Sequence, residues 1–252
     1  MELLSDGGIL SAAFAAGFVA VVFAAIVQSS TGIGFGLIAA PVMLLIDPKF
    51  VPGTIIFLGI MISFLSAARD VKHIDRSFVA AGIAGRLPAA ILAASLLASL
   101  SPTLFQTLFA VLVLLAVAMS LFGPAIKPSM TSAAIAGVLS GFMGTLTSVG
   151  APPFAIALQN MPPNQLRATM NAVLLLGACV SLVSLTIFGR FGVPDMVRGL
   201  ALIPAVLFGF YAARFVIADP RSAPWLRPAV LGLCVLASVA LLARAAITVF
   251  AA

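Results

Sequence analysis

Hydrophobic residues occur along the chain in long runs, which are separated by short stretches containing charged residues, glycine and proline. The runs cover residues 10–28, 37–46, 51–68, 78–98, 103–122, 131–146, 153–160, 168–188, 195–216 and 226–249. A helix needs about 20 apolar residues to cross the hydrocarbon core of a bilayer. The pattern predicts an all-α polytopic membrane protein in which the runs 37–46 and 153–160 are too short to cross.

Each short run follows a longer one across a stretch rich in glycine, serine and threonine. The first stretch contains Gln28, Ser29, Ser30, Thr31, Gly32, Gly34 and Gly36. The second stretch contains Thr145, Thr147, Ser148, Gly150, Pro152 and Pro153. Glycine is costly inside a helix, and proline removes a backbone donor. We therefore expect both stretches to break a helix.

The two expected breaks are related by an offset of 116 residues, which places Thr31-Gly32 over Thr147-Ser148. After each break come a short apolar piece, a polar turn, a long run, a basic turn that ends in aspartate and two more runs. Recurrence of a whole series of features indicates an internal duplication. We predict two homologous half-repeats, residues 1–124 and 125–252, each with a broken or re-entrant first helix.

The relative orientation of the half-repeats depends on whether each broken pair crosses the membrane once or forms a hairpin. Single crossings give a parallel repeat, whereas hairpins give five segments per half and an inverted repeat. With hairpins, the inner side holds Arg69, Lys72, Arg76, Lys127, Arg167, Arg214, Arg221 and Arg227, and the outer side holds Lys49, Arg190, Arg198 and Arg244. With single crossings, the same bases split seven to five. Because basic residues accumulate on the cytoplasmic side, the charges favour the inverted repeat.

The composition excludes a soluble protein and argues against a nucleic-acid-binding one. Charged residues make up 8% of the chain, apolar residues 63%, and the mean hydropathy is +1.26. Charged residues account for about 25% of an ordinary soluble domain. The 13 lysines and arginines are scattered singly between the apolar runs, whereas a nucleic-acid-binding protein gathers them on one face. We expect a lipid bilayer around the protein and no nucleic acid partner.

The sequence lacks the residue patterns that catalysis or metal binding would need. Cys179 and Cys234 lie far apart in apolar runs, without any metal-ligand spacing. His73, the only histidine, lies in a charged turn. The sequence contains no Walker A loop, H-E-x-x-H helix or nucleophile elbow. We predict that the protein is not an enzyme, has no catalytic residue and binds no cofactor or metal.

The breaks themselves are the strongest candidates for a binding site. A break inside a bilayer survives only where it is buried in protein or lines a wet cavity, because unpaired backbone groups are costly in hydrocarbon. The helix that follows a break begins with free N–H groups and a partial positive charge, which suit an anion. The alternative is that residues 32–36 and 137–141 are packing faces and that the hydroxyls bond their own backbone. The duplication of the break, with Pro152 and Pro153 beside glycine, favours the binding site.

Charged and amide side chains narrow the candidate chemistry further. All seven carboxylates fall in termini or turns: Glu2, Asp6, Asp47, Asp70, Asp75, Asp195 and Asp219. No intramembrane carboxylate is then available as a proton relay or sodium ligand. Arg86 lies well inside the run 78–98, where it either binds a substrate anion or snorkels to the basic turn nearby. Gln28 and Asn171 either add amides to the same site or join helices to each other.

Two motifs resemble those of the sulfite exporter TauE/SafE family. They are Thr31-Gly32-Ile33-Gly34-Phe35-Gly36, with Pro41 a few residues on, and Thr147-Ser148-Val149-Gly150-Ala151-Pro152-Pro153. The resemblance spans essentially the whole chain, and it implies a bacterial inner-membrane transporter of sulfite, sulfoacetate or related organic anions. The second motif departs from the family pattern T-G-x-G-G-P-P at Ser148 and Ala151, which reshapes the loop expected to touch the ligand.

The residues and the resemblance together predict a secondary transporter that moves a small anion, bound between the two helix breaks where the repeats meet. The candidate substrate-binding residues are Gln28, Ser29, Ser30, Thr31, Gly32, Gly34, Gly36, Arg86, Thr145, Thr147, Ser148, Gly150, Pro152, Pro153 and Asn171. The alternative is a membrane-embedded substrate-capture subunit or scaffold that needs a partner. The sequence leaves open the identity of the anion, the direction of transport, the coupling ion and the oligomeric state.

Overall fold

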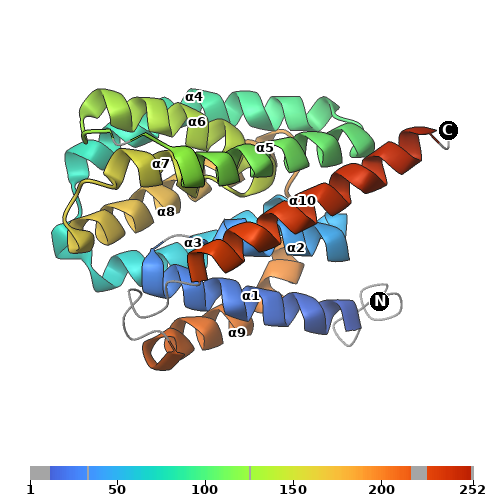
Figure 1. The fold of residues 1–252 in the computed structure, drawn as a ribbon, viewed down its shortest axis with the longest axis horizontal. Helices are drawn as coiled ribbons and strands as arrows, with labels where there is room; N and C mark the ends of the chain where they lie inside the picture. The colour runs from blue at the N-terminus through green and yellow to red at the C-terminus, as the bar shows by residue number, and fades with distance from the viewer. Residues whose placement is uncertain (1–11, 33, 125, 217–225, 251–252) are drawn as a thin grey trace.

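The computed structural model describes residues 12–32, 34–124, 126–216 and 226–250. Across these residues the chain is helical, and each predicted apolar run corresponds to one α-helix (Figure 1). The helices are α1 (Ala12–Thr31), α2 (Phe35–Ile46), α3 (Gly53–Arg69), α4 (Arg76–Ser99), α5 (Pro102–Phe122), α6 (Met130–Thr147), α7 (Ala151–Leu158), α8 (Pro163–Ile187), α9 (Val193–Val216) and α10 (Leu226–Phe250). Short 3-10 helices at Pro48–Phe50 and Val71–His73 lie on either side of α3. The predicted all-α fold is confirmed.

Six helices of the described chain are long and apolar enough to cross a membrane: α1, α4, α5, α6, α8 and α9. Large apolar side chains such as Phe122, Phe208 and Ile187 are exposed on the outside of the bundle. A soluble protein rarely exposes contiguous apolar surface on this scale, because water opposes it. The protein is therefore an integral membrane protein whose outer surface suits lipid.

Both short helices fold back on the helix before them and form re-entrant hairpins. A Cβ added at Gly17 in α1 would lie 2.9 Å from the sulfur of Met43 near the end of α2, so the two helices pack antiparallel. After α7, the Gln159 Nε2 donates to the Pro124 carbonyl at 2.7 Å, which returns the chain to the beginning of α6. The hairpin alternative considered from the sequence is therefore the one found.

The helix breaks are shorter than the sequence predicts. The residues 28–31 form the last turn of α1, and Thr145 and Thr147 belong to the last turn of α6. The hydroxyls of Ser29, Ser30, Thr31 and Thr147 each donate to the carbonyl four residues earlier, at 2.7 to 2.9 Å. These local bonds are compatible with helix continuation. The helices end only where Gly32 and Ser148 adopt positive φ, at 80° and 64°.

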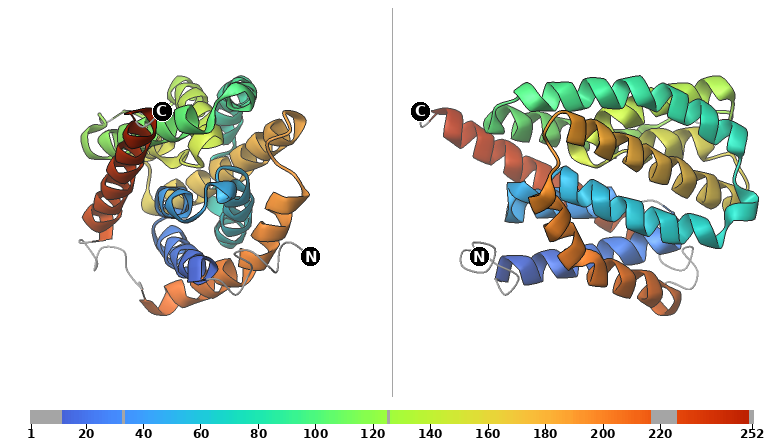
Figure 2. Two further views of the ribbon diagram at one scale, coloured as in Figure 1. Left: turned by 90° about the vertical axis from the view of Figure 1, so that its right-hand side faces the viewer. Right: turned by 180° about the vertical axis from the view of Figure 1, so that it is seen from behind.

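The helices pack in a pattern that stays the same when α1–α5 and α6–α10 are exchanged. Helix α4 packs on α6 as α9 packs on α1, α3 packs on α8, and α5 packs on α10. The pairs α4/α6 and α1/α9 form opposite sides of the bundle, and α3 and α8 lie between them (Figures 1 and 2). Helices α1 and α6 run in opposite directions in these views. The central position of α3 and α8 places both hairpins beside the middle of the molecule.

Two hydrogen bonds illustrate the same pattern at the level of single residues. The Thr54 hydroxyl at the start of α3 donates to the Asp195 carbonyl at 3.2 Å, next to the start of α9. Correspondingly, the Asp75 N–H before α4 donates to Thr169 Oγ1 in α8 at 3.0 Å. Thr54 and Thr169 are 115 residues apart, close to the offset that aligns the breaks. The common origin of the halves and their boundary at residue 124 stay predictions.

Close backbone contacts join α4 to α6. A Cβ added at Gly85 would meet the Ala134 carbonyl oxygen, and one added at Gly137 would meet the carbonyl oxygen of Gly82. A Cβ at Gly141 would lie 2.6 Å from the carbonyl oxygen of Arg86. Small residues that let helices approach closely are typical of membrane proteins. The packing interpretation of residues 137–141 therefore holds. This close contact with α6 fixes the position of Arg86 along the bundle.

Candidate functional site

The two helix breaks meet inside the bundle. A Cβ added at Gly36, in the first turn of α2, would meet the carbonyl oxygen of Ser148 in the second break. The Ser148 hydroxyl in turn donates to the Pro52 carbonyl at 3.1 Å, directly before α3. Glycine is needed at position 36 because the two backbones approach too closely for a side chain. Segments more than 100 residues apart are thus held against each other.

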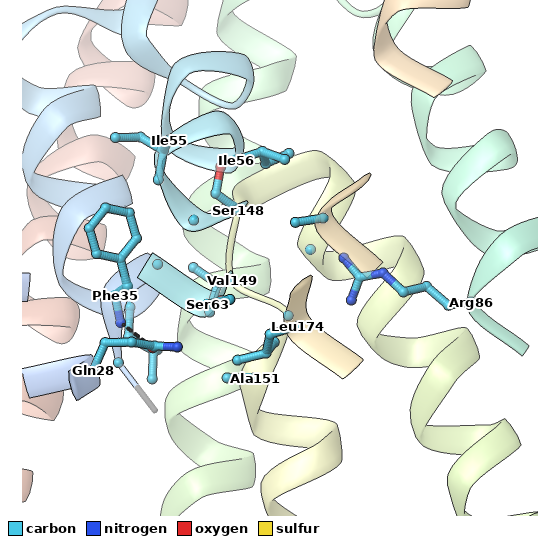
Figure 3. A pocket seen from close by; sticks show the side chains of 17 residues that line it. Gln28, Phe35, Ile55, Ile56, Ser63, Arg86, Ser148, Val149, Ala151 and Leu174 are labelled. Atoms are coloured by element: carbon cyan, nitrogen blue, oxygen red, sulfur yellow. Dashed lines mark hydrogen bonds between the residues drawn. The ribbon is translucent and has the colours of Figure 1, made fainter. Parts of the chain in front are cut away.

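A cavity lies at this meeting point (Figure 3). Its volume is about 60 Å³. The part of its wall that comes from α1 to α4 consists of Gln28, Gly34, Phe35, Gly36, Leu37, Ile55, Ile56, Gly59, Ser63 and Arg86. The other part consists of Gly144, Ser148, Val149, Gly150, Ala151, Leu174 and Ala178. A single ordered water needs roughly 10–15 Å³ of such space, so the cavity is large enough for a small ion.

The beginning of α2 presents backbone donors to the cavity. Gly34 precedes the helix with φ of 127°, a conformation that side chains with a Cβ rarely adopt. The Phe35 N–H donates to Gln28 Oε1 at 3.1 Å. The N–H groups of Gly36 and Leu37 lie in the first turn, where a helix offers them no acceptor. Gly36 and Leu37 line the cavity, so these two donors and the positive end of the helix dipole lie at its wall.

The beginning of α7 contributes fewer donors. Pro152 and Pro153 occupy the first turn and have no N–H, so Ala151 is the first-turn residue that can donate. Proline at these positions starts a helix without removing a needed hydrogen bond. The two helix starts are thus unequal, and α2 supplies the stronger set of backbone donors.

Arg86 supplies the positive charge of the cavity. It lies on α4 and is 3% exposed. Its Nη1 donates to Ser140 Oγ at 2.5 Å, and its Nη2 donates to Ser181 Oγ at 3.1 Å. Ser140 Oγ donates a hydrogen bond to the Gly150 carbonyl at 2.6 Å, and the hydroxyls of Ser181 and Thr145 are hydrogen-bonded to each other at 2.8 Å. The guanidinium is therefore tied by hydroxyls to the second break.

Glycines make the space that the Arg86 side chain occupies. A Cβ added at Gly177 in α8 would lie 2.6 Å from Cδ and Cζ of Arg86. A Cβ at Gly144 would lie 3.0 Å from Nη2, and one at Gly150 would lie 3.1 Å from Nη1. These separations are shorter than ordinary contacts, so a methyl group at any of the three positions would displace the side chain. The arginine reaches the cavity through a passage lined by glycine.

The charge of Arg86 is not balanced by a carboxylate. The ion pairs among the described residues involve Asp70 and Asp195, and none includes Arg86. The Nε of Arg86 is buried and has no hydrogen-bond partner in the described part of the chain. A buried guanidinium without a counter-charge costs several kcal/mol. Figure 3 shows its end turned toward the residues of the second break, and the side chain is buried, whereas snorkelling would bring it to the surface.

A model of the sulfite exporter TauE/SafE family matches residues 16–241. The chain belongs to the sulfite exporter TauE/SafE family. Members of this family are membrane transporters and not enzymes. The match covers both helix breaks, Arg86 and almost the whole bundle. No curated protein and no solved structure matches this chain.

Six of the predicted site residues of this TauE/SafE protein line the cavity: Gln28, Gly34, Gly36, Arg86, Ser148 and Gly150. The others lie outside its wall: Ser29, Ser30, Thr31, Gly32, Thr145, Thr147, Pro152, Pro153 and Asn171. Asn171 accepts a hydrogen bond from Gln28 Nε2 at 3.1 Å and so joins α8 to α1. Thr145 supports Arg86 through Ser181. A direct role of these residues in substrate binding stays a prediction.

Three serines of the TauE/SafE site were not predicted from the sequence. Ser140 and Ser181 bond Arg86, and Ser63 lines the cavity from α3. Ser63 is 3% exposed, so its hydroxyl belongs to the interior wall of the cavity. Each of the three is a single serine in an apolar run, a position where serine usually bonds its own helix. Only the bonds of Ser140 and Ser181 to Arg86, and the position of Ser63 in the cavity wall, distinguish them from other buried serines.

Proposed function

We propose that this TauE/SafE protein is a secondary transporter that moves a small anion, bound between the two helix breaks against Arg86. The observation that carries the proposal is the guanidinium of Arg86, buried without a counter-charge in the wall of a cavity. An intramembrane charge is rare and marks a substrate path by default. The anion would supply the missing negative charge while it is bound.

Three kinds of donor support an anion as the substrate. The guanidinium supplies charge, the start of α2 supplies the N–H groups of Gly36 and Leu37, and Ser63 supplies a hydroxyl. Each of these groups can donate a hydrogen bond to an oxyanion in its ordinary protonation state. No described carboxylate lines the cavity, which argues against a metal cation as the substrate. Sulfite and small sulfonates, which the family resemblance implies, are oxyanions that can accept from all three kinds of donor.

The position of the cavity supports transport rather than capture alone. Transporters with inverted repeats bind their substrate near the bilayer centre, between discontinuous helices contributed by both repeats. Here both re-entrant hairpins, α1/α2 and α6/α7, contribute their breaks to one cavity. We propose that residues 1–124 and 125–252 are inverted repeats and that they rock about this point. Alternating access needs two such halves around a fixed site.

The charge distribution supports one orientation in the membrane. The end of the bundle at which α3 ends and α8 begins carries Arg69, Lys72, Arg76, Lys127, Arg167 and Arg214 among the described residues. The opposite end carries Lys49, Arg190 and Arg198 among the same described residues. Because basic residues accumulate on the cytoplasmic side, we propose that the first of these ends is cytoplasmic. Three bases of the predicted count, Arg221, Arg227 and Arg244, lie outside the described side chains.

Flux through the purified protein tests the proposal. The wild type, reconstituted in liposomes, is expected to move labelled sulfite, whereas Arg86→Gln is expected to lose most of this flux. Arg86→Gln removes the charge and retains an amide that can bond the serines. The matched control is Gly232→Ala, because a Cβ at Gly232 on α10 meets nothing within 4 Å.

The same assay separates the alternatives. A substrate-capture subunit would bind the anion and show no flux without its partner, so binding without flux in the wild type would reject the transporter. Equal flux for the wild type and Arg86→Gln would show that the cavity in Figure 3 is not the substrate site. Binding is measured in parallel as the rise in melting temperature that a ligand of the folded state produces.

A further inference from the structure

We infer that the cavity selects singly charged oxyanions over doubly charged ones of the same shape. This inference rests on the proposed function and specifies the charge of the ligand that the same site takes. It follows from the count of charges around the cavity, because Arg86 is the single charged residue in its described wall. One fixed positive charge is neutralised by one negative charge.

The elements packed against α4 add no second positive charge. Helix α4 packs on α6 and α8. Helix α6 contains no titratable side chain, and α8 contains Arg167 and Cys179. Arg167 is ion-paired with Asp70 at 2.8 Å at the end of the bundle. Cys179 is a free thiol, which carries no positive charge.

The rest of the cavity wall cannot balance a second negative charge. Ile55, Ile56, Val149 and Leu174 face the cavity with apolar side chains. The polar groups that remain are neutral donors, such as the Ser63 hydroxyl and the first N–H groups of α2. Neutral donors stabilise an anion without cancelling its net charge, and the beginning of α2, with about half a positive charge, does not cancel a second full negative charge. A dianion in this cavity would retain one uncompensated charge in a low-dielectric environment, which is strongly unfavourable.

The shape of the preferred ligand follows from the positions of the donors. Arg86 approaches from α4, whereas the start of α2 with Gln28 lies on the other side of the cavity (Figure 3). An oxyanion with several oxygen atoms around a central atom can accept from both sides at once. A volume of about 60 Å³ limits such an ion to a few heavy atoms. Small sulfonate-like monoanions satisfy both conditions.

Three probes of nearly constant shape and different charge test the inference. Dimethyl sulfone is neutral, methanesulfonate carries one negative charge, and sulfate carries two; each has four groups around one sulfur. Their affinities are measured on the purified full chain by thermal shift at neutral pH and equal ionic strength. Methanesulfonate is expected to bind more than about tenfold more tightly than sulfate or dimethyl sulfone, since an unbalanced buried charge costs several kcal/mol and 1.4 kcal/mol corresponds to tenfold.

A second variant tests whether Arg86 sets this preference. In Arg86→Gln the methanesulfonate affinity is expected to fall at least about tenfold, while that of neutral dimethyl sulfone stays within threefold. Gly232→Ala serves as the matched control and is expected to keep the wild-type order of the three probes. If the variant does not fold, the wild-type ratio of methanesulfonate to sulfate decides the question on its own.

The outcomes separate the inference from the proposed function. Sulfate binding within tenfold of methanesulfonate, or an unchanged preference in Arg86→Gln, would overturn the inference and leave anion transport standing. Failure of methanesulfonate, sulfate and sulfite alike to bind the wild type would reject the anion site and, with it, the inference. Preference for methanesulfonate in the wild type that is lost in Arg86→Gln supports both.

Discussion

Replacing Gly177 with alanine should weaken anion binding without unfolding the protein. The new Cβ would lie 2.6 Å from Cδ and Cζ of Arg86, whereas ordinary van der Waals contact begins at 3.4 Å. The Nε atom of Arg86 would lie closer still, so the side chain must retreat by about 1 Å to restore ordinary contact. Because the displaced atoms lie near the end of a flexible side chain, the fold accommodates the change. The substitution therefore displaces the guanidinium of Arg86 and leaves the helices in place.

The displacement has two expected effects. Moving the guanidinium from about 4 to about 5 Å from a bound monoanion weakens their attraction by about 0.8 kcal/mol at an effective dielectric constant of about 20, which lowers the anion affinity about fourfold. Losing one of the hydrogen bonds to Ser140 or Ser181 costs about 1.5–3 kcal/mol, because the donor is charged. These bonds exist in the free protein as well, so their loss lowers its stability and not its affinity for the anion. Alanine also favours the helix by about 0.5–1 kcal/mol over glycine, which protects the fold.

Methanesulfonate affinity and sulfite flux of Gly177→Ala are measured beside the wild type and Gly232→Ala. We expect the melting temperature without ligand to stay within a few degrees of the wild type, while affinity and flux fall. Gly232→Ala makes the same chemical change on a helix where nothing lies within 4 Å, so both should be retained. An affinity of Gly177→Ala equal to that of the wild type would refute the reasoning that Arg86 must occupy its observed position.

The remaining predictions concern the breaks and one ion pair. Gly36→Val should push the two breaks apart, lowering flux and costing about 1–3 kcal/mol of stability, seen as a lower melting temperature. Gly34→Leu and Gly150→Leu should abolish sulfite flux and leave membrane insertion intact, so normal vesicle flux would contradict the site. Asp70→Asn removes the partner of Arg167, and since this pair is partly exposed we expect at most about 1 kcal/mol of destabilisation, with a larger loss pointing to additional contacts.

The fold was largely predictable because hydrocarbon imposes a simple rule on the sequence. Backbone groups in lipid must be bonded internally, so long apolar runs become helices and interruptions become breaks. All ten runs therefore correspond to helices, with boundaries that differ by a few residues. The extent of the breaks was less predictable. Ser29 and Thr147 look like loop residues in the sequence, yet their hydroxyls bond the preceding turn and the helices continue past them.

The candidate site was predictable only in part. Arg86 stood out because a charge within an apolar run is rare, and the glycines stood out because they interrupt helices. Ser63, Ser140 and Ser181 gave no such signal, since single serines are common in membrane helices and usually bond their own backbone. Asn171 was a reasonable candidate, but its amide pairs with Gln28 instead of lining the cavity. Side chains of the same type thus have different roles according to what faces them.

The sequence by itself determined the membrane environment, the helices and the two interruptions. These properties are local, because each depends on the affinity of a short segment for water or lipid. The expectation that every carboxylate lies in a terminus or turn is wrong for Asp195, which lies in the first turn of α9, and Glu2, Asp6 and Asp219 lie outside the described residues. Tertiary structure decided that both interruptions meet in one cavity and that Arg86 reaches it between glycines of α6, α8 and the second break. Those contacts join segments far apart in the chain, and they depend on the packing of α3 against α8 and of α4 against α6. Packing is a property of facing surfaces, so it becomes visible only when the helices are placed together.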